Sequence, residues 1–151
     1  MTNEENIKQQ LMQQFKLPED KVRVIRVRRI SMDVEQAVFP QVLDYAVKQL
    51  KFDHLCAITG LDDGDHLSFV YQLAGRSGII LSVKISVPKS NPVIKTVIAY
   101  FLCADVYERE LVDLFGARVE GLPPGNRYPL TDDWPQGQFP LRKDWTTDLL
   151  K

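Results

Sequence analysis

Cysteine and histidine are scarce in this sequence, which has two of each among its 151 residues. Zinc sites and iron–sulfur clusters usually take four such ligands, often supplied in closely spaced pairs. Cys56 and Cys103 lie far apart along the chain, and His54 and His66 are the only histidines. We therefore expect this chain by itself to bind no metal and no other cofactor, and its cysteines to be small buried thiols in a reducing cytoplasm.

Long apolar runs and an excess of one charge are also missing. The longest apolar run, residues 97–104, falls well short of the ~20 residues that a membrane-spanning helix needs. The N-terminus is polar and acidic, unlike a signal peptide. With 19 basic and 20 acidic side chains, the net charge of −1 gives no general attraction for nucleic acid. We expect no nucleic-acid partner, and membrane association only through partner proteins.

What is present fits one soluble α+β domain, with 44% hydrophobic and 26% charged residues. Apolar residues at helical spacing predict a helix over 7–15 and a second within 33–51, where Pro40 must lie in the first turn or delay the start. Alternating apolar residues and turn-rich connections predict an antiparallel meander of three strands. Those strands are expected at 55–61, 67–73 and 79–87.

The segment 22–30 is β-branched and contains four arginines. It predicts one strand near a sheet edge whose charges stay in water. A phosphate-binding role for these arginines is the alternative.

Two consecutive helices are predicted after the meander. Asn91 and Pro92 provide an N-cap and a first helical residue for a helix over 92–102. Asp105 followed by Glu108 matches a capping box and predicts a second helix from about 106 to 115, which Gly116 would end in a left-handed conformation. Arg109 and Asp113 stand one turn apart on this helix and can pair.

Five of the nine prolines lie between positions 123 and 140, interleaved with Tyr128, Trp134 and Phe139. Prolines at this density prevent a continuous helix or strand, and the aromatic side chains argue against simple disorder. We expect an α+β core domain over 1–116, with an antiparallel or mixed sheet packed by helices. An extended proline-rich C-terminal arm over 117–151 then lies along a surface, either of its own domain or of a partner, and partner docking is our prediction.

No catalytic residues are predicted. Glu108 and Glu110 are two residues apart on a helix and point in different directions, so they cannot act as acid and base on one substrate atom. A stand-alone enzyme that uses these carboxylates and the arginine-rich strand on a small acidic substrate is the remote alternative. An adaptor domain unconnected with redox chemistry is a further one.

The motif Glu108-Arg109-Glu110-x-x-Asp113-Leu114-Phe115-Gly116, followed by Pro140-Leu141-Arg142-Lys143-Asp144, resembles the signature of a known family. That family is the 30 kDa subunit of respiratory complex I (NADH:ubiquinone oxidoreductase), shared with subunits of membrane-bound energy-converting (group 4) NiFe hydrogenases. The histidine that complex I members usually carry after the glycine is missing here. This departure, and the compact length, make the chain more similar to the hydrogenase subunits.

The resemblance implies a non-catalytic peripheral subunit on the cytoplasmic side of the cell membrane. Its partners would be a hydrogenase-like large subunit and an iron–sulfur small subunit of a ferredoxin-linked, ion-translocating hydrogenase. Iron–sulfur clusters and a NiFe centre would lie in those other subunits, and the equivalent subunit of an NADH:quinone oxidoreductase is the alternative. The residues expected at the partner interface are Glu108, Arg109, Glu110, Asp113, Arg127, Tyr128, Trp134, Arg142, Lys143 and Asp144.

Overall fold

The N-terminal helix α1 (Asn3–Phe15) is the first element of the computed structural model, which describes residues 1–150. The Thr2 hydroxyl oxygen caps it by accepting a hydrogen bond from the Glu5 backbone N–H at 3.3 Å. Ile7 and Leu11, one turn apart, are buried. The predicted N-terminal helix is therefore confirmed.

Segment 22–30 forms a hairpin of β1 (Val22–Arg26) and β2 (Arg29–Asp33), so the single predicted strand is wrong. The two strands are antiparallel, with Val22 opposite Met32. The turn places Arg28 in the left-handed region, at a φ of 61°. Without glycine, asparagine or proline the segment gives no turn signal, which is why the sequence pattern favoured one strand.

A five-stranded sheet has the order β1-β2-β5-β4-β3, with β1 at one edge. β5 runs parallel to β2, so the sheet is mixed. The short connections between β3, β4 and β5 are compatible only with antiparallel neighbours, as the predicted meander requires. The other three strands of the sheet are β3 (His54–Asp62), β4 (His66–Ala74) and β5 (Ile80–Pro88). The helix α2 (Phe39–Lys48), which carries Pro40 in its first turn, and a short 3-10 helix, Glu19–Lys21, also belong to the first half of the chain.

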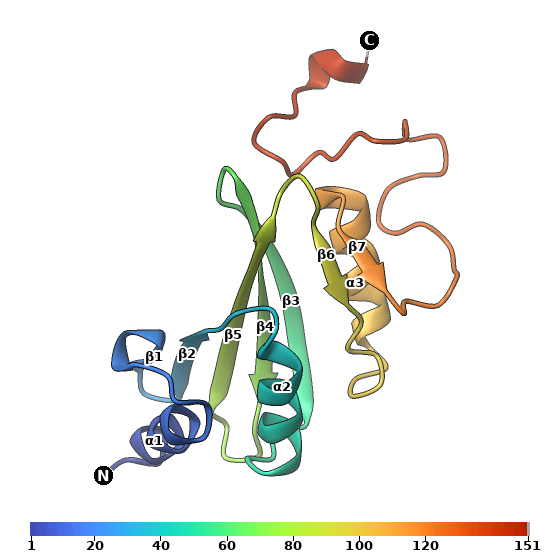
Figure 1. Ribbon diagram of the computed structural model, residues 1–151. Helices are drawn as coiled ribbons and strands as arrows, with labels where there is room; N and C mark the ends of the chain where they lie inside the picture. Colours follow the sequence, from blue (N-terminus) through green and yellow to red (C-terminus); the bar gives the residue numbers. More distant parts are fainter. Residues whose placement is uncertain (151) are drawn as a thin grey trace. The chain divides into compact units, whose positions relative to one another are not determined.

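The chain separates into two compact units. Unit 1 contains residues Met1–Ala57 and Val70–Ile85, while unit 2 contains Ile58–Phe69 and the residues from Ser86 onward. In unit 1, α1 lies beside β1 and β2 (Figure 1). Its core includes the Phe39 and Tyr71 rings, whose centroids are 4.5 Å apart.

Unit 2 contains two short parallel strands, β6 (Val93–Lys95) and β7 (Arg118–Glu120), with α3 (Ala104–Phe115) between them in the sequence. In Figure 1 the two strands lie side by side and α3 beside them. The predicted helix over 92–102 is therefore wrong. Its apolar residues have helical spacing, but several are β-branched and fit a strand, and the partner β7 comes from 25 residues further along.

Residues 121–146 contain no helix or strand, and a 3-10 helix, Thr147–Leu150, follows them. Docking of an extended arm on a partner stays a prediction, as does the boundary at 116. Cys103 is exposed and Cys56 is partly exposed, so the prediction that both thiols are buried is wrong.

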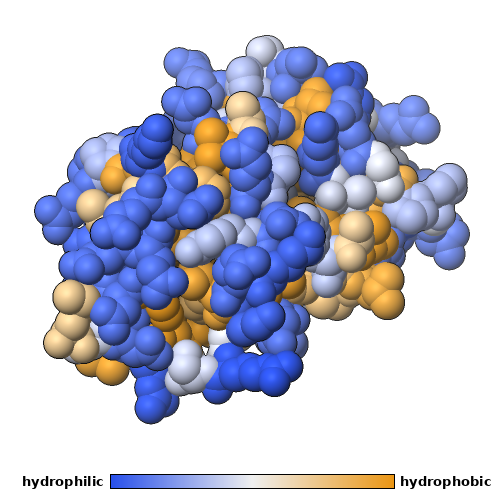
Figure 2. All heavy atoms as spheres, turned by 60° about the horizontal axis from the view of Figure 1, so that its bottom comes forward, coloured by the Kyte–Doolittle hydropathy of each residue, from blue (hydrophilic) through white to orange (hydrophobic). Residues whose placement is uncertain are grey.

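The face drawn in Figure 2 is mainly hydrophilic, with hydrophobic side chains exposed between the polar ones. Across residues 1–150, no helix combines the length and the apolar content needed to span a membrane.

Candidate functional site

Helix α3 carries the first half of the sequence motif and positions most of the candidate site. It begins after Cys103, and no side chain caps it, so the predicted capping box is wrong. Gly116 does end it in the left-handed conformation, at a φ of 72°, and its N–H donates to the carbonyl oxygens of Leu111 and Val112. The predicted helix end is therefore confirmed.

Gly116 also leaves room for a ring from the second half of the motif. A Cβ atom at this position would lie 2.5 Å from Cε2 of Phe139. Glycine is therefore required at this position by both the backbone conformation and the packing.

We expect Gly116→Ala to lower the free energy of unfolding by about 2–3 kcal/mol, because it combines left-handed backbone strain with this collision. Gly137→Ala is the matched control, since Gly137 has a φ of 76° but nothing within 4 Å of the added Cβ. The control should lose only about 1 kcal/mol. Equal losses in urea denaturation would contradict the packing role of Phe139.

Glu108 lies inside unit 2 and is fully buried. Its Oε1 accepts a hydrogen bond from the Val97 N–H at 2.7 Å, and its Oε2 accepts one from the Thr96 hydroxyl at 2.6 Å. Burial raises the pKa of the Glu108 carboxyl. Glu108 therefore joins α3 to the segment that follows β6, and does not reach the surface.

Arg109 pairs with Asp105 and not, as predicted, with Asp113. Its Nη2 donates to Asp105 Oδ1 at 2.8 Å and to the Pro123 carbonyl oxygen at 2.7 Å. A Cβ atom on Gly125 would lie 2.6 Å from the same nitrogen. The guanidinium thus connects the first turn of α3 to the start of the proline-rich segment.

Asp113 is 7% exposed and holds the next part of the proline-rich segment, around Arg127 and Leu130. Its Oδ1 accepts from Arg127 Nε at 3.1 Å and its Oδ2 from the Leu130 N–H at 3.0 Å. Arg127 Nη1 donates onward to the Trp134 carbonyl oxygen at 2.8 Å. Asp113, which the sequence predicted could pair with Arg109, therefore anchors residues 127–134 instead.

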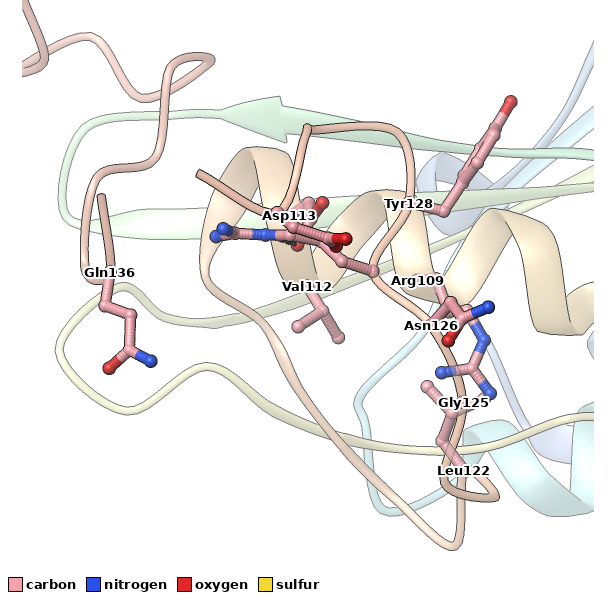
Figure 3. A pocket seen from close by; sticks show the side chains of 10 residues that line it. Arg109, Val112, Asp113, Leu122, Gly125, Asn126, Tyr128 and Gln136 are labelled. Carbon is pink, nitrogen blue, oxygen red and sulfur yellow. Dashed lines mark hydrogen bonds and ion pairs between the residues drawn. The ribbon is translucent and has the colours of Figure 1, made fainter. Parts of the chain in front are cut away.

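A pocket of about 410 Å³ lies between α3 and this segment. Arg109 and Asp113 line it from α3, and Tyr128 is exposed at its rim. Figure 3 shows Arg109 beside Gly125, and the ring of Tyr128 pointing away from Arg109. The full lining is Arg109, Val112, Asp113, Leu122, Gly125, Asn126, Arg127, Tyr128, Asp132 and Gln136. Four of the predicted interface residues thus meet here.

The second half of the motif packs against the C-terminal end of α3. Arg142 Nε donates to the Phe115 carbonyl oxygen at 2.6 Å, and its guanidinium carbon lies 4.8 Å from the centroid of the Phe139 ring. The Leu141 N–H donates to the Leu114 carbonyl oxygen at 3.1 Å. Arg142 therefore supplies a donor to a helix end whose carbonyl groups lack helical partners.

Asp62 anchors the residues that follow Arg142. It accepts hydrogen bonds from the Lys143 N–H at 2.8 Å, from Lys89 Nζ at 2.7 Å and from the Gly64 N–H at 2.9 Å. Burial works to raise the pKa of Asp62, but these donors outweigh it and lower the pKa to about 2. Lys89 also pairs with Asp144 at 3.2 Å.

Sequence reasoning missed Asp62, Lys89 and Thr96. Asp62 lies in a segment that reads as an ordinary turn, and it accepts from a residue 81 positions away. No local sequence pattern predicts a contact over such a separation.

The remaining predicted residues differ in their access to a partner. Trp134 packs against Trp145, with the ring centroids 5.8 Å apart. Trp134 and Glu110 are each half-buried. Tyr128, Lys143 and Asp144 are exposed. In the described part of the chain, no group of three or more His, Cys, Asp or Glu residues is placed to hold a metal ion.

Two solved structures share this α+β fold. One is a chain of the membrane-bound sulfane sulfur reductase, an archaeal respiratory membrane complex, with a TM-score of 0.84 over 99% of this chain and 89% of that chain. The other is a trypsin-resistant fragment of Nqo5, with a TM-score of 0.67 over 80% of this chain and 98% of that chain. Both are 24% identical in sequence, so the likeness defines the fold class.

The family model described as respiratory-chain NADH dehydrogenase, 30 Kd subunit, matches residues 32–149. The chain belongs to this family, which confirms the resemblance stated from the two motifs.

Curated relatives carry the names of several different complexes. A subunit of the F(420)H(2) dehydrogenase of Methanosarcina mazei is 34% identical over 78% of this chain and 75% of its own length. A subunit of the NADH-quinone oxidoreductase of Chloroherpeton thalassium is 37% identical over 65% of this chain, which spans 41% of that relative. The beta subunit of the membrane-bound hydrogenase of Pyrococcus furiosus is 34% identical over 55% of this chain and 50% of its own length.

Proposed function

We propose that this chain is a non-catalytic peripheral subunit of a membrane-bound, ion-translocating oxidoreductase complex, placed on the cytoplasmic side of the membrane. The family membership supports the kind of complex, and the pocket between α3 and residues 122–136 supports the way in which the chain docks. The cofactors, iron–sulfur clusters among them, would lie in the partner subunits.

The pocket provides a prearranged docking surface. Arg109 and Asp113 already hold the surrounding backbone through Pro123 and Leu130, so a partner need not order this segment on binding. Val112 and Leu122 provide apolar surface, while Asn126, Tyr128 and Gln136 provide exposed polar groups. A partner loop that inserts a side chain here would meet both kinds of contact.

We propose, as the sequence predicted, that the complex is an energy-converting NiFe hydrogenase. The similarity to a membrane-bound hydrogenase subunit supports this assignment. The similarity to the F(420)H(2) dehydrogenase subunit covers more of both chains and supports a coenzyme-oxidising complex as the second candidate, alongside an NADH:quinone oxidoreductase.

Isolation of the native complex in mild detergent tests the assignment. Nickel, iron and a hydrogenase-like large subunit that co-purify with this chain would support the hydrogenase. Flavin, iron without nickel, and oxidation of NADH or of reduced F(420) by the complex would instead place the chain in a dehydrogenase. A chain recovered alone and in soluble form would contradict the subunit role.

Docking at the pocket is tested by Asn126→Ala combined with Tyr128→Ala. Both side chains are exposed, so the free chain should keep its fold and stability. We expect at least a tenfold loss of affinity for the complex, since truncation of an interface tyrosine often has a large effect. Glu120→Ala combined with Asp133→Ala is the control, because these residues are exposed and do not line the pocket. Undiminished co-purification of the pocket variant would refute the proposed docking surface.

A further inference from the structure

The tip of the β1–β2 hairpin in unit 1 combines exposed apolar side chains with three arginines. Ile25 is 59% exposed and Val27 is 82% exposed. Arg26, Arg28 and Arg29 stand beside them, and we call these five residues the basic hairpin tip. The turn that separates β1 from β2 brings them to one end of the hairpin, which a single continuous strand would not have done.

Acidic groups of the chain neutralise little of this charge. Among residues 1–150, Arg23 has Asp33 as an ion-pair partner at 3.0 Å, but no ion pair involves the side chains of the three tip arginines. Glu4 is the acidic residue that reaches the turn, where it accepts a hydrogen bond from the Arg28 backbone N–H at 2.8 Å. The guanidinium groups thus keep donors that an external carboxylate can use.

The turn itself is held in place before any partner arrives. Besides the contact with Glu4, Arg29 Nη1 donates to the Arg28 carbonyl oxygen at 2.8 Å. β1 is the outermost strand of its sheet, so no further strand covers this side of the hairpin. A partner would therefore meet an ordered basic surface that also exposes apolar side chains.

We propose that the basic hairpin tip docks an acidic segment of a partner protein, separately from the pocket in unit 2. Guanidinium groups pair with carboxylates through two parallel hydrogen bonds. The absence of lysine from the tip matches protein interfaces, where arginine is enriched and lysine depleted.

The tip residues do not suit the other anionic surfaces. Membrane-binding segments usually include Trp, Tyr, Phe or Leu anchors, whereas the apolar residues here are the β-branched Ile25 and Val27. Surfaces that bind single-stranded nucleic acid stack bases on aromatic rings, and the tip has none. Charge complementarity therefore favours a carboxylate-rich polypeptide.

The test measures binding of the full chain to a labelled peptide of alternating glutamate and alanine. The same peptide with every glutamate replaced by glutamine is the uncharged control. We expect the acidic peptide alone to bind, and raising the salt from about 0.01 M to about 0.1 M should weaken it several-fold as the screening length shortens. Arg26→Gln, Arg28→Gln and Arg29→Gln together should reduce the affinity at least tenfold. Arg76→Gln with Arg118→Gln, two exposed arginines elsewhere, should leave it unchanged.

Three outcomes would overturn the proposal. Equal binding of the acidic peptide by the triple variant and the wild-type chain, with both folded by circular dichroism, would place the binding elsewhere. Binding to phosphatidylserine vesicles with lost binding to the peptide would assign the tip to lipid. In the native complex, a photoreactive residue in place of Val27 should cross-link to a partner segment rich in Asp and Glu, and cross-linking to a neutral segment would count against the proposal. Neither the peptide assay nor the variants depend on which oxidoreductase contains the chain.

Discussion

Asp62→Ala should cost about 3 kcal/mol of unfolding free energy, one of the two largest effects that we expect of a single substitution in this chain. Asp62 is 7% exposed, and its carboxylate holds the Lys89 ammonium and two backbone N–H groups. Its removal leaves Lys89 with its ion pair to Asp144, whose side chain is 68% exposed. Breaking a buried ion pair typically costs about 3–5 kcal/mol, because the remaining charge loses its partner.

Urea denaturation measures this loss, and limited proteolysis should show earlier cleavage near Lys143. Asp65→Ala is the control, since Asp65 lies in the same turn but its side chain is exposed. If both variants unfolded at the same urea concentration, the anchoring role of Asp62 would have to be abandoned.

The same site predicts an acid dependence of stability. The pKa of Asp62 falls from 3.8 to about 2 on folding, so the folded chain holds the charged form more strongly than the unfolded chain does. The stabilisation, on the order of 2 kcal/mol, is present above pH ~4 and is lost as the pH falls toward about 2. The stability difference between the wild-type chain and Asp62→Asn should therefore shrink over this range. A difference independent of pH would show that the charge of Asp62 does not contribute.

Glu108→Ala should also cost about 3 kcal/mol, for a different reason. The substitution leaves the Val97 N–H and the Thr96 hydroxyl without their acceptor in a buried site, and it opens a cavity. Glu108→Gln is the informative companion. Its amide oxygen can accept from Val97, and the Thr96 hydroxyl can accept from its amide nitrogen, so most of the stability should return.

A comparison of Glu108→Gln with the wild-type chain also gives a pH dependence of the opposite sign. Burial raises the pKa of Glu108, so its contribution is fully present below the unfolded value of 4.5 and falls as the pH rises through the folded value. The wild-type chain should therefore lose stability relative to Glu108→Gln as the pH rises above 4.5. Thermal unfolding at several pH values measures this, and a constant difference would contradict the burial effect.

Local patterns in the sequence were sufficient for several elements. The spacing of Ile7 and Leu11 correctly predicted α1, Pro40 lies in the first turn of α2, and Gly116 ends α3. Each of these features depends on residues within a few positions of one another, so the chain near each position contains the information needed to predict it.

Several of the errors have another cause, which is competition from residues far along the chain. Glu108 has the position of a capping residue, but Thr96 and Val97 offer it buried donors instead. Asp113 could pair with Arg109 one turn away, but Arg127 reaches it from the proline-rich segment and Asp105 pairs with Arg109. The spacing of residues along a helix shows which side-chain contacts are possible, but the three-dimensional fold decides which of them form.

The hydrogen bond from Lys143 to Asp62 also bears on the order of events during synthesis. The hairpin that contains Asp62 leaves the ribosome long before Phe139, Arg142 and Lys143, yet unit 2 needs all of them to close its packing around the end of α3. Translation proceeds from the N-terminus, so unit 1 can fold early, whereas the packing of unit 2 around the end of α3 is completed only after nearly the whole chain has been released. Assembly through the proposed docking surface would therefore wait until the chain is almost complete.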